Sequence, residues 1–243
     1  MTPIFLKIIL FSLIPVFTMT VSGIIGIYKK TNGNVRSLIL HFAAGIVFSV
    51  VAVEILPNVV KEHKPFQVVI GFVLGLLTML LIKHLGEDKQ KETVNTSGKA
   101  IPMGLIMGIG VDIFIDGLLL GIGFSAGEAT GTLLAIALSI ELISLGIATA
   151  TELVGNGVKK DKSIGIIASL AFLFFISAIM GATLLHNLSD SAMEIVLSFG
   201  LSALLFLVTE ELLIEAHEEK ETVWHTSVFF FGFLVFLILG MIV

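Results

Sequence analysis

The sequence contains no cysteine. Disulfide bonds, iron–sulfur clusters and thiolate zinc sites are therefore excluded in any compartment, because each of them needs cysteine sulfur. If the protein binds a metal, oxygen atoms or histidine imidazoles must hold it.

Charged residues are scarce as well. They make up 14% of the chain, whereas 56% of the residues are hydrophobic and the mean hydropathy is +1.07. A water-soluble core of this size does not need so many apolar residues. A bilayer-spanning helix takes roughly 20 apolar residues, so the apolar stretches described next fill about two thirds of the chain. The sequence predicts an all-α, polytopic membrane protein without a soluble domain, which excludes a hydrolase, kinase or DNA-binding protein with a membrane tail.

Eight apolar segments are separated by charged or turn-forming residues, and we expect each to form one transmembrane helix of a single domain, 1–243. The predicted spans cover residues 3–28, 38–60, 66–85, 101–124, 130–153, 163–187, 192–215 and 223–243. The connections are short, so sequential helices should run antiparallel. The first apolar run extends to Ile27 without a strongly basic start, which indicates a retained span and not a cleavable signal peptide. The polar segment 86–100 is expected to be a solvated loop.

The basic residues divide unequally between the two sets of loops. Three of them, Lys7, Lys61 and Lys64, lie on the side of the amino terminus. The other eleven lie on the opposite side, at Lys29, Lys30, Arg36, Lys83, Lys89, Lys91, Lys99, Lys159, Lys160, Lys162 and Lys220. Because cytoplasmic loops carry an excess of Lys and Arg, the sequence predicts that the second side, with loop 86–100, is cytoplasmic and that both termini are extracellular.

Three acidic residues fall deep inside predicted spans. Asp112 and Asp116 are four residues apart in span 4 and therefore share one helix face, while Glu141 lies near the centre of span 5. Spans 4 and 5 are adjacent and antiparallel, so Asp112 and Glu141 should lie at the same depth. A charge there costs on the order of 2.5–3.5 kcal/mol, and neither Lys nor Arg occurs at that depth in the sequence. We expect the three carboxylates to hold a cation or protons.

The two helices that carry these acids also match each other. Asp112 and Glu141 are each followed five residues later by a glycine, Gly117 and Gly146. Such a pair is typical of a site built on an approximate two-fold axis. Span 4 is rich in glycine, which allows helix backbones to approach closely.

Further acids and imidazoles mark the two ends of a cation path. Glu54, near the outer end of span 2, is a candidate entrance. Candidate exit residues lie at the inner end of span 7, at Glu210, Glu211, Glu215 and His217. For Glu54 and Glu211 an interfacial anchor is an equally good interpretation, and a solvated charge run explains residues 215–221 better than a site does. Glu194 and His225 are interpreted as loop or interfacial residues.

The chain resembles the ZIP (Zrt/Irt-like) family of divalent metal transporters along essentially its whole length. Residues 44–57 of span 2 look like the family's A-G … E-L-L-P, and residues 205–216 of span 7 look like its L-Y-V … E-L-x-P-E-A. Residues 231–233, Phe-Gly-Phe, are also similar. The resemblance implies eight helices in a 3+2+3 arrangement, extracellular termini and a homodimer.

The family's helix-4 motif, H-N-x-P-E-G, is altered in this sequence. Gly117 is kept and Asp116 stands in place of the family's Glu. Asp112 stands in place of its His, Ile113 in place of its Asn and Ile115 in place of its Pro.

The helix-5 motif, H-x-x-P-E-G, is altered in the same way. Gly146 is kept, while Glu141 replaces the His, Ser144 the Pro and Leu145 the Glu. The resemblance then implies one midplane metal site instead of two, with oxygen ligands only. Such ligands favour hard cations such as Mn²⁺ or Fe²⁺, and conceivably Mg²⁺ or Ca²⁺, although carboxylates also bind Zn²⁺.

These observations predict a transporter, and not an enzyme, that carries a divalent cation of the Zn, Mn or Fe class into the cytoplasm by alternating access. Asp112, Asp116 and Glu141 form the predicted transport site. The expected partners are the metal cation and the bilayer, with no organic cofactor and no nucleic acid, and the expected location is a cell membrane, as in a bacterial cytoplasmic membrane.

Two alternative functions remain open on the sequence. The first is a non-transporting metal sensor or scaffold. It applies if the loss of the family's prolines and the replacement of its Glu by Leu145 disable the permeation pathway. The second is an intramembrane aspartyl protease. Residues 108–112 faintly resemble a glycine-rich aspartate motif. That motif needs an aspartate directly after its second glycine and a partner aspartate on another helix, whereas here the other helix supplies Glu141.

Overall fold

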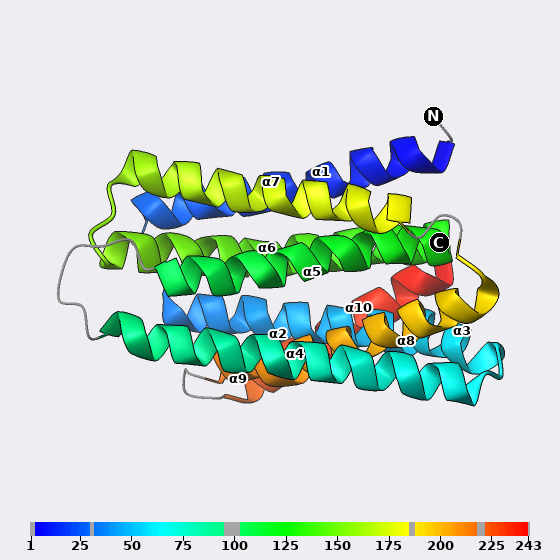
Figure 1. The fold of residues 1–243 in the computed structure, drawn as a ribbon. Helices are drawn as coiled ribbons and strands as arrows, with labels where there is room; N and C mark the ends of the chain where they lie inside the picture. The colour runs from blue at the N-terminus through cyan, green and yellow to red at the C-terminus, as the bar shows by residue number, and fades with distance from the viewer. Residues whose placement is uncertain (1–2, 30–31, 95–102, 185–187, 218–221, 243) are drawn as a thin grey trace.

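Figure 1 shows a computed structural model of the chain, which describes residues 3–29, 32–94, 103–184, 188–217 and 222–242. Every element in these ranges is a helix. In chain order the elements are α1 (Pro3–Tyr28), α2 (Gly33–Val50), η1 (Val51–Ile55), α3 (Leu56–Lys61), α4 (Pro65–Val94), α5 (Met103–Ala126), α6 (Glu128–Gly155), α7 (Lys160–Leu184), α8 (Asp190–Phe206), η2 (Leu207–Leu212), α9 (Leu213–Ala216) and α10 (Val223–Ile242). The two η elements are π-helical turns.

The prediction of an all-α membrane protein with eight spanning helices is confirmed. Within the described ranges, eight helical segments are long and apolar enough to cross a bilayer. They are Phe5–Tyr28, Gly33–Lys61, Pro65–His84, Ile106–Ala126, Glu128–Gly155, Lys160–Thr183, Asp190–Ala216 and Val223–Ile242. The second of these segments joins α2, η1 and α3, and the seventh joins α8, η2 and α9.

The segments run side by side and alternate in direction, so the bundle has two distinct ends (Figure 1). The start of α1 and the end of α10 lie at one end, which we call the terminus end. Lys61 and Glu128 also lie there. The opposite end, which we call the loop end, carries Tyr28 and Lys160.

The structure corrects the predicted boundary of loop 86–100. α4 continues to Val94, so residues 86–94 are helical, and only residues 95–100 of the predicted loop lie outside the described residues. The physical reason is composition, because Glu, Lys and Gln lose little side-chain entropy in a helix and rank among the good helix formers. A polar segment next to an apolar helix can therefore extend that helix into water.

Two of the spanning segments, Gly33–Lys61 and Asp190–Ala216, contain a π-helical turn in their second half. In the first, η1 is followed by Pro57, which lacks a backbone N–H and whose ring crowds the carbonyl of Val53, four residues earlier within η1. A widened turn relieves that crowding. No proline follows η2, so local sequence does not explain it. Such turns inside α-helices frequently occur at functional sites.

Four helix pairs make the most extensive contacts: α1 with α6, α5 with α7, α2 with α10, and α4 with α8. In each pair the two helices run in the same direction. A glycine lies where each pair of backbones meets, with Gly146 facing α1, Gly117 facing α7, Gly232 facing α2 and Gly75 facing α8. Close backbone approach through small residues is the usual way in which helices associate in a membrane.

These pairs combine into two groups of helices. α1, α5, α6 and α7 contact one another, whereas α2–α10 and α4–α8 form the other group. The groups meet mainly through α2 on α6 and α4 on α5. Asp112 and Glu141 belong to α5 and α6, the two helices of the first group that face the second.

Gly117 provides a test of this packing. A Cβ atom at this position would lie 2.5 Å from the carbonyl oxygen of Phe174 in α7, and overpacking of this kind costs about 1–3 kcal/mol. We expect Gly117→Ala to lower the Tm in detergent. Gly108→Ala on the same helix is the control, because no described atom beyond its own stretch of helix lies within 4 Å of its Cβ position. Equal Tm values for the two variants would contradict the assigned contact.

Candidate metal centre

Asp112, Asp116 and Glu141 converge in the interior of the bundle. One carboxylate oxygen from each lies within 4.8 Å of the others, a spacing at which one metal ion could bind all three. Asp116 is 1% exposed and Glu141 is 3% exposed, while Asp112 is half-buried. Within the described ranges, these residues form the one group of three or more potential ligands that is close enough to share a metal.

The local sequence explains how three acids reach one point. Asp112 and Asp116 are separated by about one helical turn on α5, so both side chains point to the same side. Glu141 stands midway along the antiparallel neighbour α6. Gly117 and Gly146, which follow on the same two helices, seat α5 against α7 and α6 against α1. The acids therefore lie on helices whose positions are fixed by close backbone contact.

The described residues leave several carboxylate oxygens of the centre without hydrogen-bond partners. Asp116 Oδ2 and Glu141 Oε2 are buried and have no hydrogen-bond partner among the described residues. The hydroxyl of Ser144, one turn along α6, is buried without a partner as well. Burying an unpaired charge in a medium of low polarity is strongly unfavourable. A bound cation would supply the missing compensation for the carboxylate oxygens.

A fourth carboxylate adjoins the centre. Glu211, on η2, lines the same small cavity as Asp112 and Glu141. A cavity of about 30 Å³ separates the two helix groups here, and its lining includes Asp112, Glu141, Ser144, Glu211 and Glu215. This volume exceeds the roughly 10–15 Å³ that one water molecule needs. The centre therefore adjoins a small polar space on the side of the loop end.

Two other predicted exit residues pair with basic side chains. Glu210 is exposed and forms an ion pair with Lys83 at 2.7 Å. Glu215 forms an ion pair with Arg36, and both side chains are partly exposed. The predicted exit residues thus divide between Glu211, which reaches the centre, and Glu210 and Glu215, which pair with basic side chains outside it.

The remaining exit residue, His217, belongs to a group of imidazoles at the loop end. Its ring lies 5.3 Å from that of His41 in α2, and the His41 ring lies 5.3 Å from that of His225 in α10. His225 is 2% exposed, although the sequence suggested an interfacial residue. The spacing of these histidines along the sequence gave no signal, because they come from three separate segments.

Glu54, the predicted entrance, lies on η1 toward the terminus end. One of its carboxylate oxygens accepts a hydrogen bond from the hydroxyl of Thr130 at 3.4 Å. It is not a member of the central cluster. Its neighbour Ile55 and its partner Thr130 line an apolar constriction, so Glu54 lies beside this constriction.

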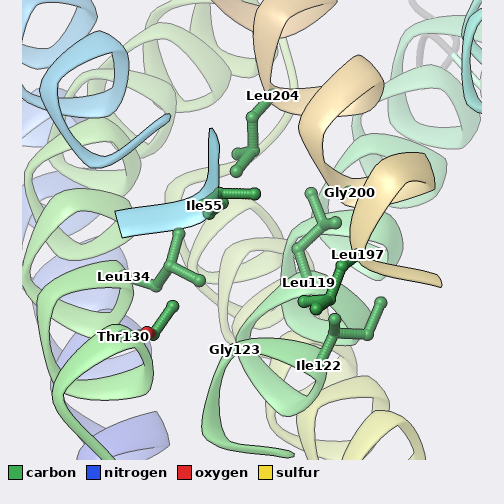
Figure 2. Close-up of a pocket in the computed structure, with 9 residues that line it drawn as sticks. All are labelled: Ile55, Leu119, Ile122, Gly123, Thr130, Leu134, Leu197, Gly200 and Leu204. Atoms are coloured by element: carbon green, nitrogen blue, oxygen red, sulfur yellow. The ribbon is translucent and has the colours of Figure 1, made fainter. Parts of the chain in front are cut away.

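Figure 2 shows this constriction, into which side chains point from η1, α5, α6 and α8. Thr130 carries the one side-chain oxygen among the nine residues drawn. The space inside is about 10 Å³, at the lower limit for a single water molecule. Ile55, Leu119 and Leu204 help to close it. The centre is thus separated from the terminus end by apolar side chains.

The donor set determines which ligands fit. Three or four carboxylates, with a serine hydroxyl beside them, are oxygen ligands of the kind that hard divalent cations prefer. No imidazole lies in the cluster itself. No model of a known protein family matches the chain, and no curated protein matches it either. Assignment of the centre therefore rests on its geometry.

Replacing one carboxylate gives a test that does not depend on transport. We expect Glu141→Gln to raise the Tm in metal-free detergent, because it removes one of three buried carboxyl groups that are costly to ionise together. We also expect it to weaken the stabilisation by Mn²⁺, which for wild-type protein at 100 times Kd adds about 2.7 kcal/mol. Glu152→Gln, at an exposed position of the same helix, should match wild type. Equal stabilisation of all three proteins by Mn²⁺ would contradict the assigned centre.

Proposed function

We propose that the protein is a membrane transporter that moves a divalent metal cation across the bilayer through the centre formed by Asp112, Asp116 and Glu141. The observation that carries this proposal is the meeting of three carboxylate oxygens within 4.8 Å, on buried or half-buried side chains of two spanning helices. Ionisable groups at membrane depth generally mark ion or substrate pathways. The metal is the transported substrate, and the mechanism requires no organic cofactor.

The oxygen ligands favour Mn²⁺ or Fe²⁺ as substrates over Zn²⁺, for which imidazole is the better ligand. One cation per chain is the expected stoichiometry. Ile113 and Leu145 stand where the resembled ZIP family carries the Asn and Glu that would complete a second midplane site. Ile113 is fully buried and Leu145 lines the cavity beside Asp112, and neither offers an oxygen ligand.

The 3+2+3 arrangement of that family is part of the proposal. A two-fold rotation about an axis in the membrane plane would exchange α5 with α6, α1 with α7, α2 with α8 and α4 with α10. The close pairs support this symmetry, because α1–α6 then corresponds to α5–α7 and α2–α10 corresponds to α4–α8. The π-helical turns also correspond, since η1 follows α2 and η2 follows α8. Inverted repeats of this kind are common in secondary transporters.

Alternating access is the mechanism that fits these features. The apolar constriction of Figure 2 closes the centre toward the terminus end, while Glu211 and the small cavity lie toward the loop end. Movement of the group α1, α5, α6 and α7 against the other four spans would close one side and open the other. The lysine asymmetry supports a cytoplasmic loop end and extracellular termini, which makes transport inward. A bacterial cytoplasmic membrane and a homodimer complete the proposal.

The direct test is flux into proteoliposomes that contain the purified protein, with Mn²⁺, Fe²⁺, Zn²⁺ and Mg²⁺ offered separately. We expect uptake of Mn²⁺ or Fe²⁺ to exceed uptake of Zn²⁺. Asp112→Asn should lower this flux by more than about tenfold, because loss of even a supporting residue outside the ligand set costs roughly 10–100-fold in metal affinity.

Glu152→Gln serves as the control for expression and insertion, since it is an exposed acid on α6 away from the centre. Preferred uptake of Zn²⁺ would refute the argument from oxygen ligands while leaving transport intact. Binding of Mn²⁺ without flux of any metal would replace the transporter by a metal sensor.

A further inference from the structure

A second unpaired acid lies outside the central cluster, near the terminus end of α8. Glu194 is 1% exposed, and neither of its carboxylate oxygens has a hydrogen-bond partner among the described residues. Helix capping does not account for it. Ser189 caps α8 and Asp190 occupies the first turn, where an acid complements the helix dipole, but Glu194 lies beyond that turn.

Glu194 lines the largest cavity among those described in the bundle. This cavity has a volume of about 350 Å³ and lies between α3, the end of α5 and the start of α8. Its lining carries three carboxylates, from Glu62, Asp190 and Glu194, against one ammonium group, from Lys61. Glu62 also forms an ion pair with Lys64 at 3.0 Å. Asn58 and Ser125 add neutral oxygen atoms. The space is large enough for a hydrated cation.

This cavity, the apolar constriction and the centre follow one another along two helices. On α5, Ser125 lines the cavity, Leu119 the constriction, and Asp112 the centre. The distance along the axis of α5 from Ser125 to Asp112 is about 20 Å, at a rise of 1.5 Å per residue.

The same order holds on the segment α8–η2, from Glu194 through Leu204 to Glu211. Leu197 borders both the cavity and the constriction. The two helices therefore connect Glu194 with the central carboxylates through one short apolar barrier.

We propose that Glu194 is the main ligand of a second cation site, at which a hydrated divalent cation binds before it crosses the constriction. This site rests on the proposed function for its role in transport, although not for binding itself. An acidic cleft with low-dielectric walls concentrates cations near the barrier and can raise association rates by about tenfold or more. Because the cation keeps most of its water, binding here is weaker than at the centre.

Binding of Mn²⁺ to purified protein is the primary test, because it does not require transport. In the background Asp112→Asn/Asp116→Asn/Glu141→Gln, which removes all three central carboxylates, we expect weak binding of about one Mn²⁺ per chain. Addition of Glu194→Gln to this background should abolish the residual binding, whereas Glu128→Gln should not. Glu128 is the matched control, since it is an acid at the same end that is exposed and paired with Lys7.

Transport kinetics give the second test. At low ionic strength, Glu194→Gln should raise the half-saturating concentration of Mn²⁺ about tenfold with little change in the maximal rate. High salt should reduce this difference between variant and wild type, because it screens the negative charges that line the cavity of the wild-type protein. Glu194→Gln removes no hydrogen bond seen among the described residues, so it should fold, and its metal-free Tm should equal or exceed that of wild type.

Two outcomes would overturn the second site. One is residual Mn²⁺ binding that persists after Glu194→Gln, and the other is no Mn²⁺ binding in the background without the central carboxylates. If the wild-type protein binds Mn²⁺ at both places but moves none, the proposed function fails while the second site stands.

Discussion

The unfavourable free energy of burying carboxylates inside a membrane is the constraint on which the structure depends. Asp116 and Glu141 are almost fully buried, and each has an oxygen without a protein partner among the described residues. The folded chain retains this cost because helix pairs such as α5–α7 and α1–α6 are held by close backbone contact at glycine. Packing energy elsewhere thus maintains a cluster in which carboxylate oxygens stay unpaired among the described residues.

The same constraint gives the interior its polarity pattern. Carboxylates occur at the centre, at Glu211 beside it and at Glu194 beyond the constriction, whereas the constriction itself is apolar. An aqueous channel lined with acids throughout would leak cations. An apolar barrier between two acidic sites fits the proposed alternating access, in which passage depends on a movement of the helices.

Much of this arrangement could be predicted from the sequence. The number of spans followed from apolar run length, and the centre followed from the rarity of charge at membrane depth together with the spacing of Asp112 and Asp116. Both signals are local. The placement of Glu211 beside Asp112 depends on η2, for which no proline or glycine gives a sign, so it could not be predicted. The sequence indicates a loop or interfacial position for Glu194. Its burial gives no local signal, because it depends on α3, α5 and α8, which are distant in sequence. The helical extension of α4 departs from the prediction because a run of polar residues with high helix propensity resembles a loop by its polarity alone.

The central claim is that a divalent cation binds between α5 and α6 with oxygen ligands only. Anomalous diffraction from crystals grown with Mn²⁺ tests it most directly. The account predicts one strong peak per chain in contact with carboxylate oxygens of Asp112, Asp116 and Glu141, absent from crystals of Asp112→Asn. Well-diffracting crystals of wild-type protein in saturating Mn²⁺ with no peak between these three residues would contradict it.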